Sequence, residues 1–364
     1  MSYTFPTNPG ELTADWLTAQ LRASGATTRA AVTSFALTPI GEGVGMLAVI
    51  TRIALTYDVA EPAAPSTVIA KFATPSEQNR AVAAHFHVYE REAFFLRDVA
   101  GHTTAPIPTV YGVEIDVPSG EFVLLMEDLG AYRTGDQVAG CGVAEAKLVL
   151  DAITPVHAAY WGRTDRPELD FAPRIDGDMQ RVGMSGACTS GWEECMKRFG
   201  HLVPDVVHAA RERYTSSAED LHRRMGRLPQ TLAHGDLRLD NIMFGITPAH
   251  RPAAVLDWQG VIVSAAVQDV AYLLTQNLTI DNRRAHEREL LEHYHARLTE
   301  HGVTGYPFTQ FEADYRLAAL YLFVYAVVIG GTLDPSNERG LAFMGQLIER
   351  ACSAIVDHDL LSLL

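Results

Sequence analysis

The chain has 364 residues, which is enough for two ordinary domains or for one two-lobed enzyme. Hydrophobic residues make up 48% of it, so the chain can bury a large core and is not disordered as a whole. The formal net charge of -15 argues against a nucleic-acid-binding protein, whereas it is compatible with a cationic substrate or a metal-bound nucleotide.

Cysteine usage and apolar segments bear on the compartment. The four cysteines form no C-x-x-C pair and no metal-ligand spacing, so we expect buried, reduced thiols and a cytoplasmic protein. The first residues lack the basic and apolar regions of a signal peptide. The longest apolar run, residues 317–331, is too short to cross a bilayer comfortably, and we expect it to form a buried core helix.

The first third of the chain predicts a β-rich lobe. A helix over residues 11–23 is followed by alternating, β-branched segments that Gly or Pro residues separate. One long helix is predicted after them, with a serine at its N-cap. The expected strands cover residues 34–40, 48–58, 66–73, 108–116 and 121–129, and the long helix covers residues 76–100.

The rest of the chain predicts mainly helices. Good helical candidates cover residues 142–162, 206–226, 269–278 and the stretch after residue 308, whereas short strands are expected at 231–236, 241–246 and 253–258. We therefore expect an α+β protein with two lobes. The smaller lobe, residues 1–127, would hold an antiparallel sheet and one long helix, and the larger, residues 128–364, would be mainly helical.

A polar cluster stands out in the second lobe. The stretch "LAHGDLRLDN" contains Asp236 and, five residues later, Asn241, and the apolar segment "AAVLDW" then delivers Asp257. This spacing fits a catalytic loop of the H-x-D-x-x-x-x-N kind, followed by a second magnesium ligand. Because magnesium prefers oxygen ligands from one or two carboxylates plus phosphates, a metal-bound nucleotide explains why these anions can lie close together.

Phosphoryl transfer also requires a phosphate-binding turn and a cation upstream, and candidates occur in the required order. Gly41, Gly43 and Gly45 lie between two predicted strands, where glycines let backbone N–H groups approach phosphates, although a plain hairpin turn has the same composition. Lys71 in "VIAKFA" offers one compact charge. A glutamate in the long helix could hold Lys71 in place, but helical phase does not separate Glu92 from Glu90.

At this point the chain resembles the aminoglycoside phosphotransferase and choline kinase group, which has a protein-kinase-like fold. The resemblance is strongest to the ecdysteroid-kinase-like branch of bacterial phosphotransferases. It rests on "YEREAFFL", "VLLMEDLG", "GDQVAGCGVAEAKLVLDAITPVHAAYWG", "LAHGDLRLDNIMFG" and "VLDWQGV" with "QDVAYLL", which span most of the chain from about residue 41 to residue 274. Of these motifs, "HGDLRLDN" and "LDWQ" are the specific ones.

The resemblance implies an ATP- and Mg²⁺-dependent enzyme that phosphorylates a hydroxyl group of a small molecule, such as an aminoglycoside, an amino alcohol or a lipophilic alcohol. Asp236 would be the catalytic base, and Arg238 would lie near the transferred phosphoryl group unless it forms a structural ion pair. The metal ligands would be Asn241 and Asp257. The nucleotide would be held by Gly41, Gly43, Gly45, Lys71 paired with Glu92, and a hinge segment that contains Met126, the Glu127 carbonyl and the Leu129 N–H group.

Two departures argue against a protein kinase. Asp257 is followed by Trp-Gln rather than Phe-Gly, and no Ala-Pro-Glu segment follows it. A non-catalytic nucleotide-binding pseudokinase is the other alternative, but neither the base nor a metal ligand is missing. The acceptor, the choice between ATP and GTP, and the oligomeric state stay open.

Other polar and aromatic residues are expected to be structural. His234 would orient backbone, Asp269 would anchor the loop, and His157 would pack inside a helix bundle. Four aromatic residues close together in the C-terminal part could line an apolar pocket, but a plain core is the simpler interpretation. These aromatic residues are Tyr315, Tyr321, Phe323 and Tyr325.

Overall fold

The computed structural model describes residues 3–40, 47–334 and 337–364. It divides into two compact units. Unit 1 comprises Met1–His102, Ile107–Tyr132 and Leu256–Gly260. Unit 2 comprises Thr103–Pro106, Arg133–Val255 and Val261–Leu364. Residues 256–260, which contain Asp257, therefore belong to unit 1 although they follow most of unit 2 in the chain.

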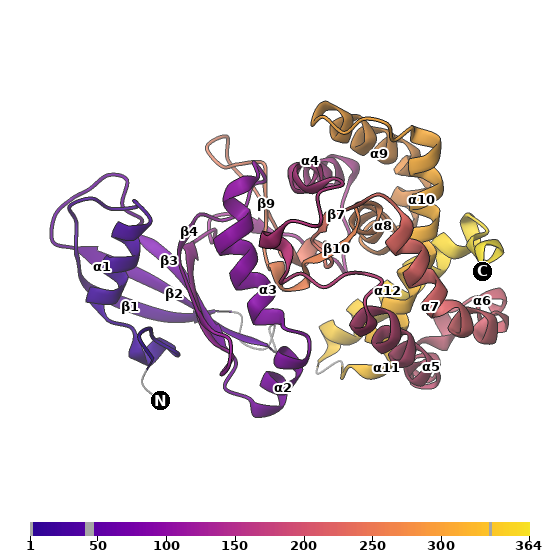
Figure 1. Cartoon of the computed structure of the whole chain (residues 1–364), viewed down its shortest axis with the longest axis horizontal. Helices are drawn as coiled ribbons and strands as arrows, with labels where there is room; N and C mark the ends of the chain where they lie inside the picture. The colour runs from indigo at the N-terminus through magenta and orange to yellow at the C-terminus, as the bar shows by residue number, and fades with distance from the viewer. Residues whose placement is uncertain (1–2, 41–46, 335–336) are drawn as a thin grey trace. The chain divides into compact units, whose positions relative to one another are not determined.

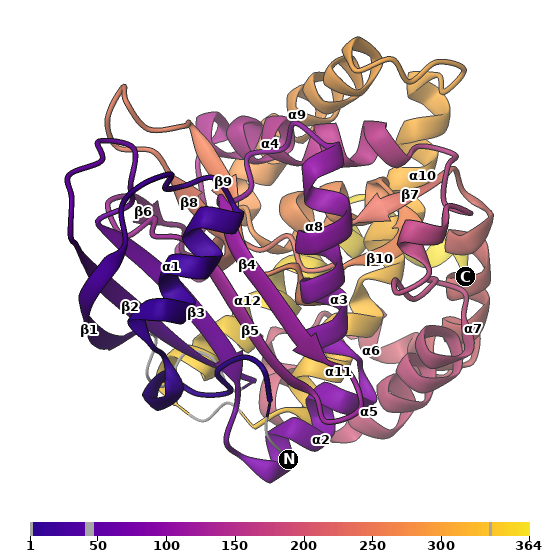
Figure 2. The same ribbon diagram turned by 60° about the vertical axis from the view of Figure 1, so that its left-hand side comes forward.

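Unit 1 is built on a five-stranded antiparallel sheet with the order β1-β2-β3-β5-β4, seen nearly face-on in Figure 2. Its strands are β1 (Val32–Ile40), β2 (Ala48–Tyr57), β3 (Thr67–Ala73), β4 (Val110–Asp116) and β5 (Glu121–Glu127). Its helices are α1 (Ala14–Ala23), α2 (Glu77–His85) and α3 (Val88–Phe94), and α3 continues into a π-helical turn at Phe95–Val99. The antiparallel sheet of the α+β prediction is confirmed.

The central strands β3 and β5 are largely buried, whereas β1 is mostly exposed, and α1 and α3 lie on opposite sides of the sheet (Figure 1). On one face, Phe72 and Val68 of β3 pack with Leu17 and Leu21 of α1 in an apolar core. Since side chains alternate along a strand, Lys71 points to the opposite face, which α3 covers. The period-2 pattern of "TVIAKFA" thus separates the core residues from the charged one.

The prediction of one long helix over residues 76–100 is wrong. The first helix, α2, ends at His85 with Phe86 as its C-cap, and His87 adopts a left-handed conformation with φ of 52° before α3 begins at Val88. The buried Arg91 side chain donates to the Phe86 carbonyl, with Nε at 2.9 Å, and so satisfies a carbonyl group at the end of α2. A glycine usually takes the left-handed position after a helix, and because His87 takes it here, this break is hard to predict from the sequence.

Unit 2 is mainly helical, as predicted. Its helices are α4 (Val143–Tyr160), α5 (Ser185–Phe199), α6 (Asp205–Ala209), α7 (Arg211–Arg227), α8 (Val267–Gln276), α9 (Ile280–Glu300), α10 (Phe308–Tyr321), α11 (Phe323–Thr332) and α12 (Glu338–Asp357). Every residue of α8 is buried. This helix therefore lies in the core of unit 2 and offers a rigid support for the loops that contact it.

Short strands frame the polar loop of unit 2. They are β6 (Arg133–Thr134), β7 (Gln230–Ala233), β8 (Ile242–Phe244), β9 (Ala253–Val255) and β10 (Ile262–Ala265). β7 pairs with β10, whereas β8 pairs with both β6 and β9. The sequence analysis did not predict β10, whose four residues are buried and show no alternation. Residues 234–241 connect β7 to β8 and contain the "HGDLRLDN" motif.

The longest apolar segment is part of the core of unit 2. Phe308–Thr332, which spans α10 and α11, has the length and hydropathy to cross a bilayer, but 67% of its most apolar window is buried. Core helices of folded proteins share this composition, so it is weak evidence for a membrane span. Tyr315, Tyr321 and Phe323 are buried at 1% exposure or less, which favours the core interpretation of the aromatic cluster.

Candidate active site

Lys71 on β3 is the centre of a charged cluster in unit 1. Its Nζ lies 2.7 Å from Oε2 and 2.9 Å from Oε1 of Glu92 on α3, and 3.2 Å from Oδ1 of Asp257. Lys71 and Glu92 are both almost fully buried. Glu90 instead lies 3.4 Å from His87, so the geometry selects Glu92 as the partner of Lys71.

When Glu92 is ionised, the three groups carry one positive and two negative charges, and burial acts on Lys71 and Glu92. Burial alone would lower the pKa of Lys71, but Asp257 and Glu92 outweigh it and raise that pKa above its ordinary value. Burial raises the pKa of Glu92 to about 7, and the neighbouring Asp257 charge adds to this rise while Lys71 opposes it. The excess negative charge makes the cluster a place where a further cation is stabilised.

The backbone presents Asp257 in an unusual conformation. Its φ is 59°, in the left-handed region that non-glycine residues rarely occupy. The following residue, Trp258, is 1% exposed and stacks on Phe95 with ring centroids 3.8 Å apart. The Asp257 side chain is one-third exposed. Burial of Trp258 thus stabilises the turn that directs Asp257 towards Lys71.

Asp236, Asn241 and Arg238 meet in the loop of unit 2 between β7 and β8. Asn241 Nδ2 donates to the Asp236 carbonyl at 3.0 Å and to Asp236 Oδ2 at 3.1 Å. Arg238 Nε donates to the same Oδ2 at 3.1 Å, and Arg238 also lies 3.7 Å from Asp240. The Asp236 side chain remains 37% exposed, so its carboxylate is accessible from solvent. Arg238 therefore forms the ion pair that was the alternative to a position near the phosphoryl group, and its partner is Asp236.

A buried scaffold supports this loop. Asp269 of α8 accepts hydrogen bonds from the N–H groups of His234 at 2.6 Å and Gly235 at 2.9 Å, and from His157 Nε2 at 3.0 Å. Burial opposes ionisation of Asp269, but His157, His234 and Gly235 outweigh it and lower its pKa below the ordinary value. His234 Nδ1 in turn accepts from the Asp236 N–H at 3.2 Å. His234, Asp269 and His157 thus have the structural positions expected from the sequence.

Tyr272 of α8 is a further residue in contact with this loop that was not predicted from the sequence. It lies three residues after Asp269 on α8, so both side chains share one helix face. Its hydroxyl is within hydrogen-bonding reach of the Asp236 and Gln137 side chains. Burial, together with the Asp236 charge, raises the pKa of Tyr272 well above its ordinary value, which keeps the hydroxyl protonated as a donor. The i, i+3 spacing from Asp269 in "QDVAYLL" is the signal that could have identified it.

The hinge segment, residues 126–130, follows the end of β5. Met126 pairs with Ile69, two residues before Lys71, and therefore lies on the Lys71 face of the sheet. Glu127 accepts from the N–H and hydroxyl groups of Thr109 through its side chain. The Leu129 carbonyl accepts from Tyr132, whereas within the described residues its N–H group has no hydrogen-bond partner. Gly41, Gly43 and Gly45 lie outside the described residues.

The candidate metal ligands are oxygen donors. Because Asn241 turns its Nδ2 towards Asp236, its Oδ1 is the atom that would face a cation. Within the described residues, no group of three or more His, Cys, Asp or Glu side chains could hold a metal ion. Carboxylate and amide oxygens are each donor types that Mg²⁺ accepts, and Mg²⁺ takes few protein ligands and completes its shell with phosphates and water.

The chain is similar to kinase-like proteins. The model of the ecdysteroid kinase-like family matches residues 42–303. An uncharacterized kinase-like protein from Caenorhabditis elegans is 24% identical over 231 residues, which cover 62% of this chain and 61% of that protein. The chain thus matches less than two thirds of that relative.

Two solved structures share the fold at low sequence identity. The GDP complex of a mutant aminoglycoside 2'-phosphotransferase-IIIa superposes with a TM-score of 0.56 at 13% identity, over 95% of this chain and all of that one. Ethanolamine kinase from Plasmodium vivax superposes with a TM-score of 0.55 at 10% identity, over 90% of this chain and 83% of that one.

Proposed function

The chain belongs to the ecdysteroid kinase-like family, and from this we propose that it is an ATP- and Mg²⁺-dependent O-phosphotransferase that acts on a hydroxyl of a small molecule. The observation that carries the proposal is the cluster of Lys71, Glu92 and Asp257 in unit 1. A buried lysine held by two carboxylates is stabilised as a cation, and Asp257 retains an exposed part for a metal ion.

Each residue of the candidate site would have a different role in the reaction. Lys71 would neutralise charge on the non-transferred phosphates, and Asn241 with Asp257 would hold Mg²⁺, which lowers the charge on the β- and γ-phosphates when bound. Asp236 would receive the proton of the acceptor hydroxyl as its oxygen bonds to the γ-phosphorus. The bond from that phosphorus to the bridging oxygen then breaks, and ADP leaves with the electron pair.

For the acceptor, we propose a class of molecules rather than one compound. The relatives of known fold include an enzyme named for aminoglycosides and one named for ethanolamine, and the net charge of -15 suits a cationic molecule. We therefore propose amino alcohols and aminoglycosides as the first candidates and lipophilic alcohols as the next.

The test is a screen for ADP release. Purified protein is incubated with Mg-ATP and a panel of hydroxylated amines, aminoglycosides, sugars, macrolides and sterol-like alcohols, and phosphorylated products are identified by ³¹P NMR. The proposal expects acceptor-dependent ADP release that EDTA abolishes and Mg²⁺ restores. Tight Mg-ATP binding without turnover on any acceptor would instead support the pseudokinase alternative, and transfer to peptides alone would contradict a small-molecule acceptor.

A further inference from the structure

Asp128 in the hinge segment joins three parts of unit 1. Its carboxylate accepts two hydrogen bonds from Arg52 on β2, from Nε at 2.7 Å and from Nη2 at 3.1 Å. It also accepts from the Gly130 N–H at 2.9 Å and interacts with the Thr67 side chain at the start of β3. The Asp128 side chain is only 8% exposed. Two-point pairing of a guanidinium with a buried carboxylate fixes orientation as well as distance.

Strand register places this pair on the same face as Lys71. Arg52 is paired with Ile69 across β2 and β3, and Ile69 is paired with Met126 across β3 and β5. Residues paired in this way point to one face of a sheet, so Arg52 lies in a row with Met126. The row next to it on that face contains Lys71. Arg52 thus lies opposite Ile69, which is two residues before Lys71 on β3. This shift brings Arg52 closer than Lys71 to the end of β5 where the hinge segment begins.

Glycine at position 130 leaves the space that the Arg52 side chain occupies. A Cβ atom built on Gly130 would lie 2.1 Å from Arg52 Nη2 and 2.9 Å from Asp128 Oδ1. Any larger residue would therefore displace the guanidinium from its two-point contact. The sequence "MEDLG" thus contains both Asp128, which provides the carboxylate, and Gly130, which leaves room for the Arg52 guanidinium.

We propose that Arg52 and Asp128 are positioning residues for the base of the nucleotide. Their ion pair, which we call the hinge clamp, holds the hinge segment against β2 so that the Leu129 N–H group stays presented to the base edge. This inference rests on the proposed function, in which a nucleoside triphosphate binds along the hinge segment. The clamp is distinct from the phosphate-binding cluster, because it contacts neither Lys71 nor Asp257 in any hydrogen bond between described residues.

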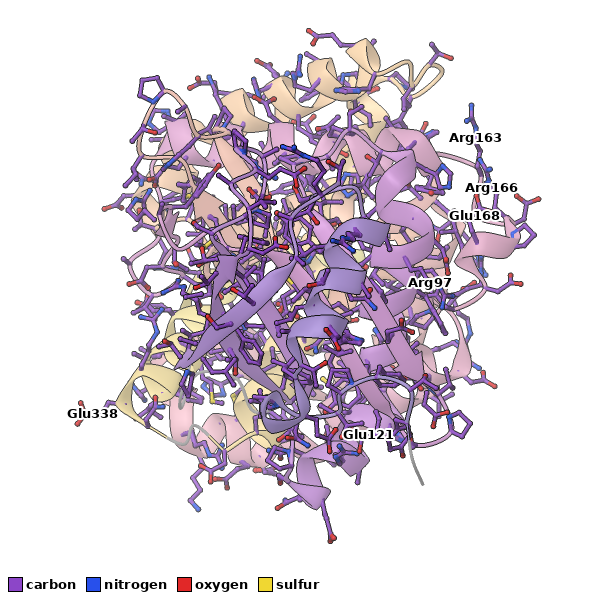
Figure 3. All side chains as sticks on the ribbon, turned by 90° about the vertical axis from the view of Figure 1, so that its left-hand side faces the viewer. Arg97, Glu121, Arg163, Arg166, Glu168 and Glu338 are labelled. Atoms are coloured by element: carbon purple, nitrogen blue, oxygen red, sulfur yellow. The ribbon has the colours of Figure 1, made fainter. Side chains whose placement is uncertain are left out.

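A second ion pair in unit 1 provides a matched control. Arg80 Nη2 lies 2.7 and 2.8 Å from the two oxygens of Glu121. The side-chain exposures are similar, at 30% and 16% for this pair and 37% and 8% for the hinge clamp. Glu121, labelled in Figure 3, begins β5, whereas the hinge segment lies at the opposite end of that strand. Loss of the Arg80–Glu121 ion pair should therefore affect the stability of the protein but not its affinity for nucleotides.

The experiment measures binding of three ligands by calorimetry to the wild-type protein and to R52M, D128N, G130A and R80M. The ligands are Mg-ATP, adenosine and Mg-tripolyphosphate, so that the base and the phosphates are probed separately. We expect R52M, D128N and G130A to weaken binding of ATP and adenosine about tenfold, because the binding-competent hinge conformation is less populated. Tripolyphosphate binding should not change, and R80M should leave the affinity for all three ligands at the wild-type value.

The outcomes separate the two proposals. If the wild-type protein binds no Mg-ATP, the proposed function fails and the clamp with it. If the wild-type protein binds Mg-ATP but R52M and D128N bind it equally well, only the clamp is wrong. Equal losses for ATP and tripolyphosphate would assign the pair a general structural role and would also overturn the inference. Thermal melts of each variant establish that it is folded, and R52K should recover part of the lost affinity.

Discussion

Trp258 stacks on Phe95 with ring planes 12° from parallel. The contact joins the turn after Asp257 to the helical segment that continues α3, which carries Glu92. Two members of the charged cluster, Glu92 and Asp257, are therefore held together by an apolar contact next to them. Lys71 contacts both, so the position of the cation depends on this stacking as well.

Replacing Trp258 should consequently impair both stability and magnesium-dependent nucleotide binding. Trp258→Ala removes a fully buried ring, which typically costs about 3–5 kcal/mol of unfolding free energy, and releases the turn that presents Asp257. Trp258→Phe should keep most of the affinity, because a ring can still stack. Denaturant unfolding and calorimetry with Mg-ATP measure the two effects.

Trp192 provides the control for that experiment. It is 2% exposed in α5 of unit 2, so Trp192→Ala should lower stability by a similar amount. The fraction of Trp192→Ala that remains folded should bind Mg-ATP as the wild-type protein does. Equal losses of affinity in both alanine variants would show that Trp258 has no specific role at the site.

Glu92 should make the stability of the protein depend on pH. A glutamate in an unfolded chain titrates at about pH 4.3, whereas burial raises the pKa of Glu92 to about 7 in the folded protein. Between these values the folded state holds a proton that the unfolded state has released, so the free energy of unfolding falls as pH rises. Above about pH 7 both states are ionised and the penalty is complete.

Glu92→Gln should therefore flatten the decline in melting temperature between about pH 4.5 and pH 7.5. Lys71 keeps Asp257 as a partner in this variant, so it is not left buried without a counter-charge. Glu90→Gln is the control, since Glu90 contacts His87 instead of Lys71. A melting profile of Glu92→Gln parallel to that of the wild-type protein would contradict this account of the cluster.

The sequence predicted those parts of the site that depend on local motifs. The H-x-D-x-x-x-x-N spacing brings Asp236 and Asn241 together within one loop. The helical and alternating patterns of apolar residues are sufficient to predict the α+β architecture. Contacts between segments that are distant in the chain were harder to predict from the sequence. The pairing of Arg52 with Asp128 depends on the register of β2, β3 and β5, and the stacking of Trp258 on Phe95 depends on the break of the helix at His87. Neither register nor helix phase after a break can be read from composition.

Tyr272 should contribute to the rate through its contact with Asp236. Tyr272→Phe keeps the buried ring and removes only the hydroxyl that lies within reach of the carboxylate. A hydrogen bond to a charged group is worth about 1.5–3 kcal/mol, so kcat should fall about tenfold or more and the melting temperature should fall by several degrees. Tyr294→Phe, which removes a hydroxyl bonded to His157 on the far side of Asp269, is the comparison. A kcat of Tyr272→Phe within twofold of the wild-type value would remove Tyr272 from the catalytic set.

Asp236 and Asp257 are both carboxylates, but their proposed roles differ in the step at which each one acts. Asp236 would matter only once the acceptor and ATP are both bound, because it receives the proton of the acceptor hydroxyl. Asp236→Asn keeps the shape of the side chain, and general-base contributions are roughly 10²–10⁴-fold. This variant should lose turnover by such a factor while it binds Mg-ATP nearly as the wild-type protein does.

Asp257 would matter as soon as the nucleotide binds, because it holds Mg²⁺ against the phosphates. Asp257→Asn loses a charged ligand, so both the rate and the magnesium dependence of ATP affinity should decrease. Calorimetry of both variants with ATP, in Mg²⁺ and in EDTA, tests the assignment. The wild-type protein and Asp236→Asn should bind ATP more tightly in Mg²⁺ than in EDTA, whereas Asp257→Asn should show little difference. If Asp236→Asn abolishes Mg-ATP binding and Asp257→Asn leaves it intact, the two carboxylates have each other's role.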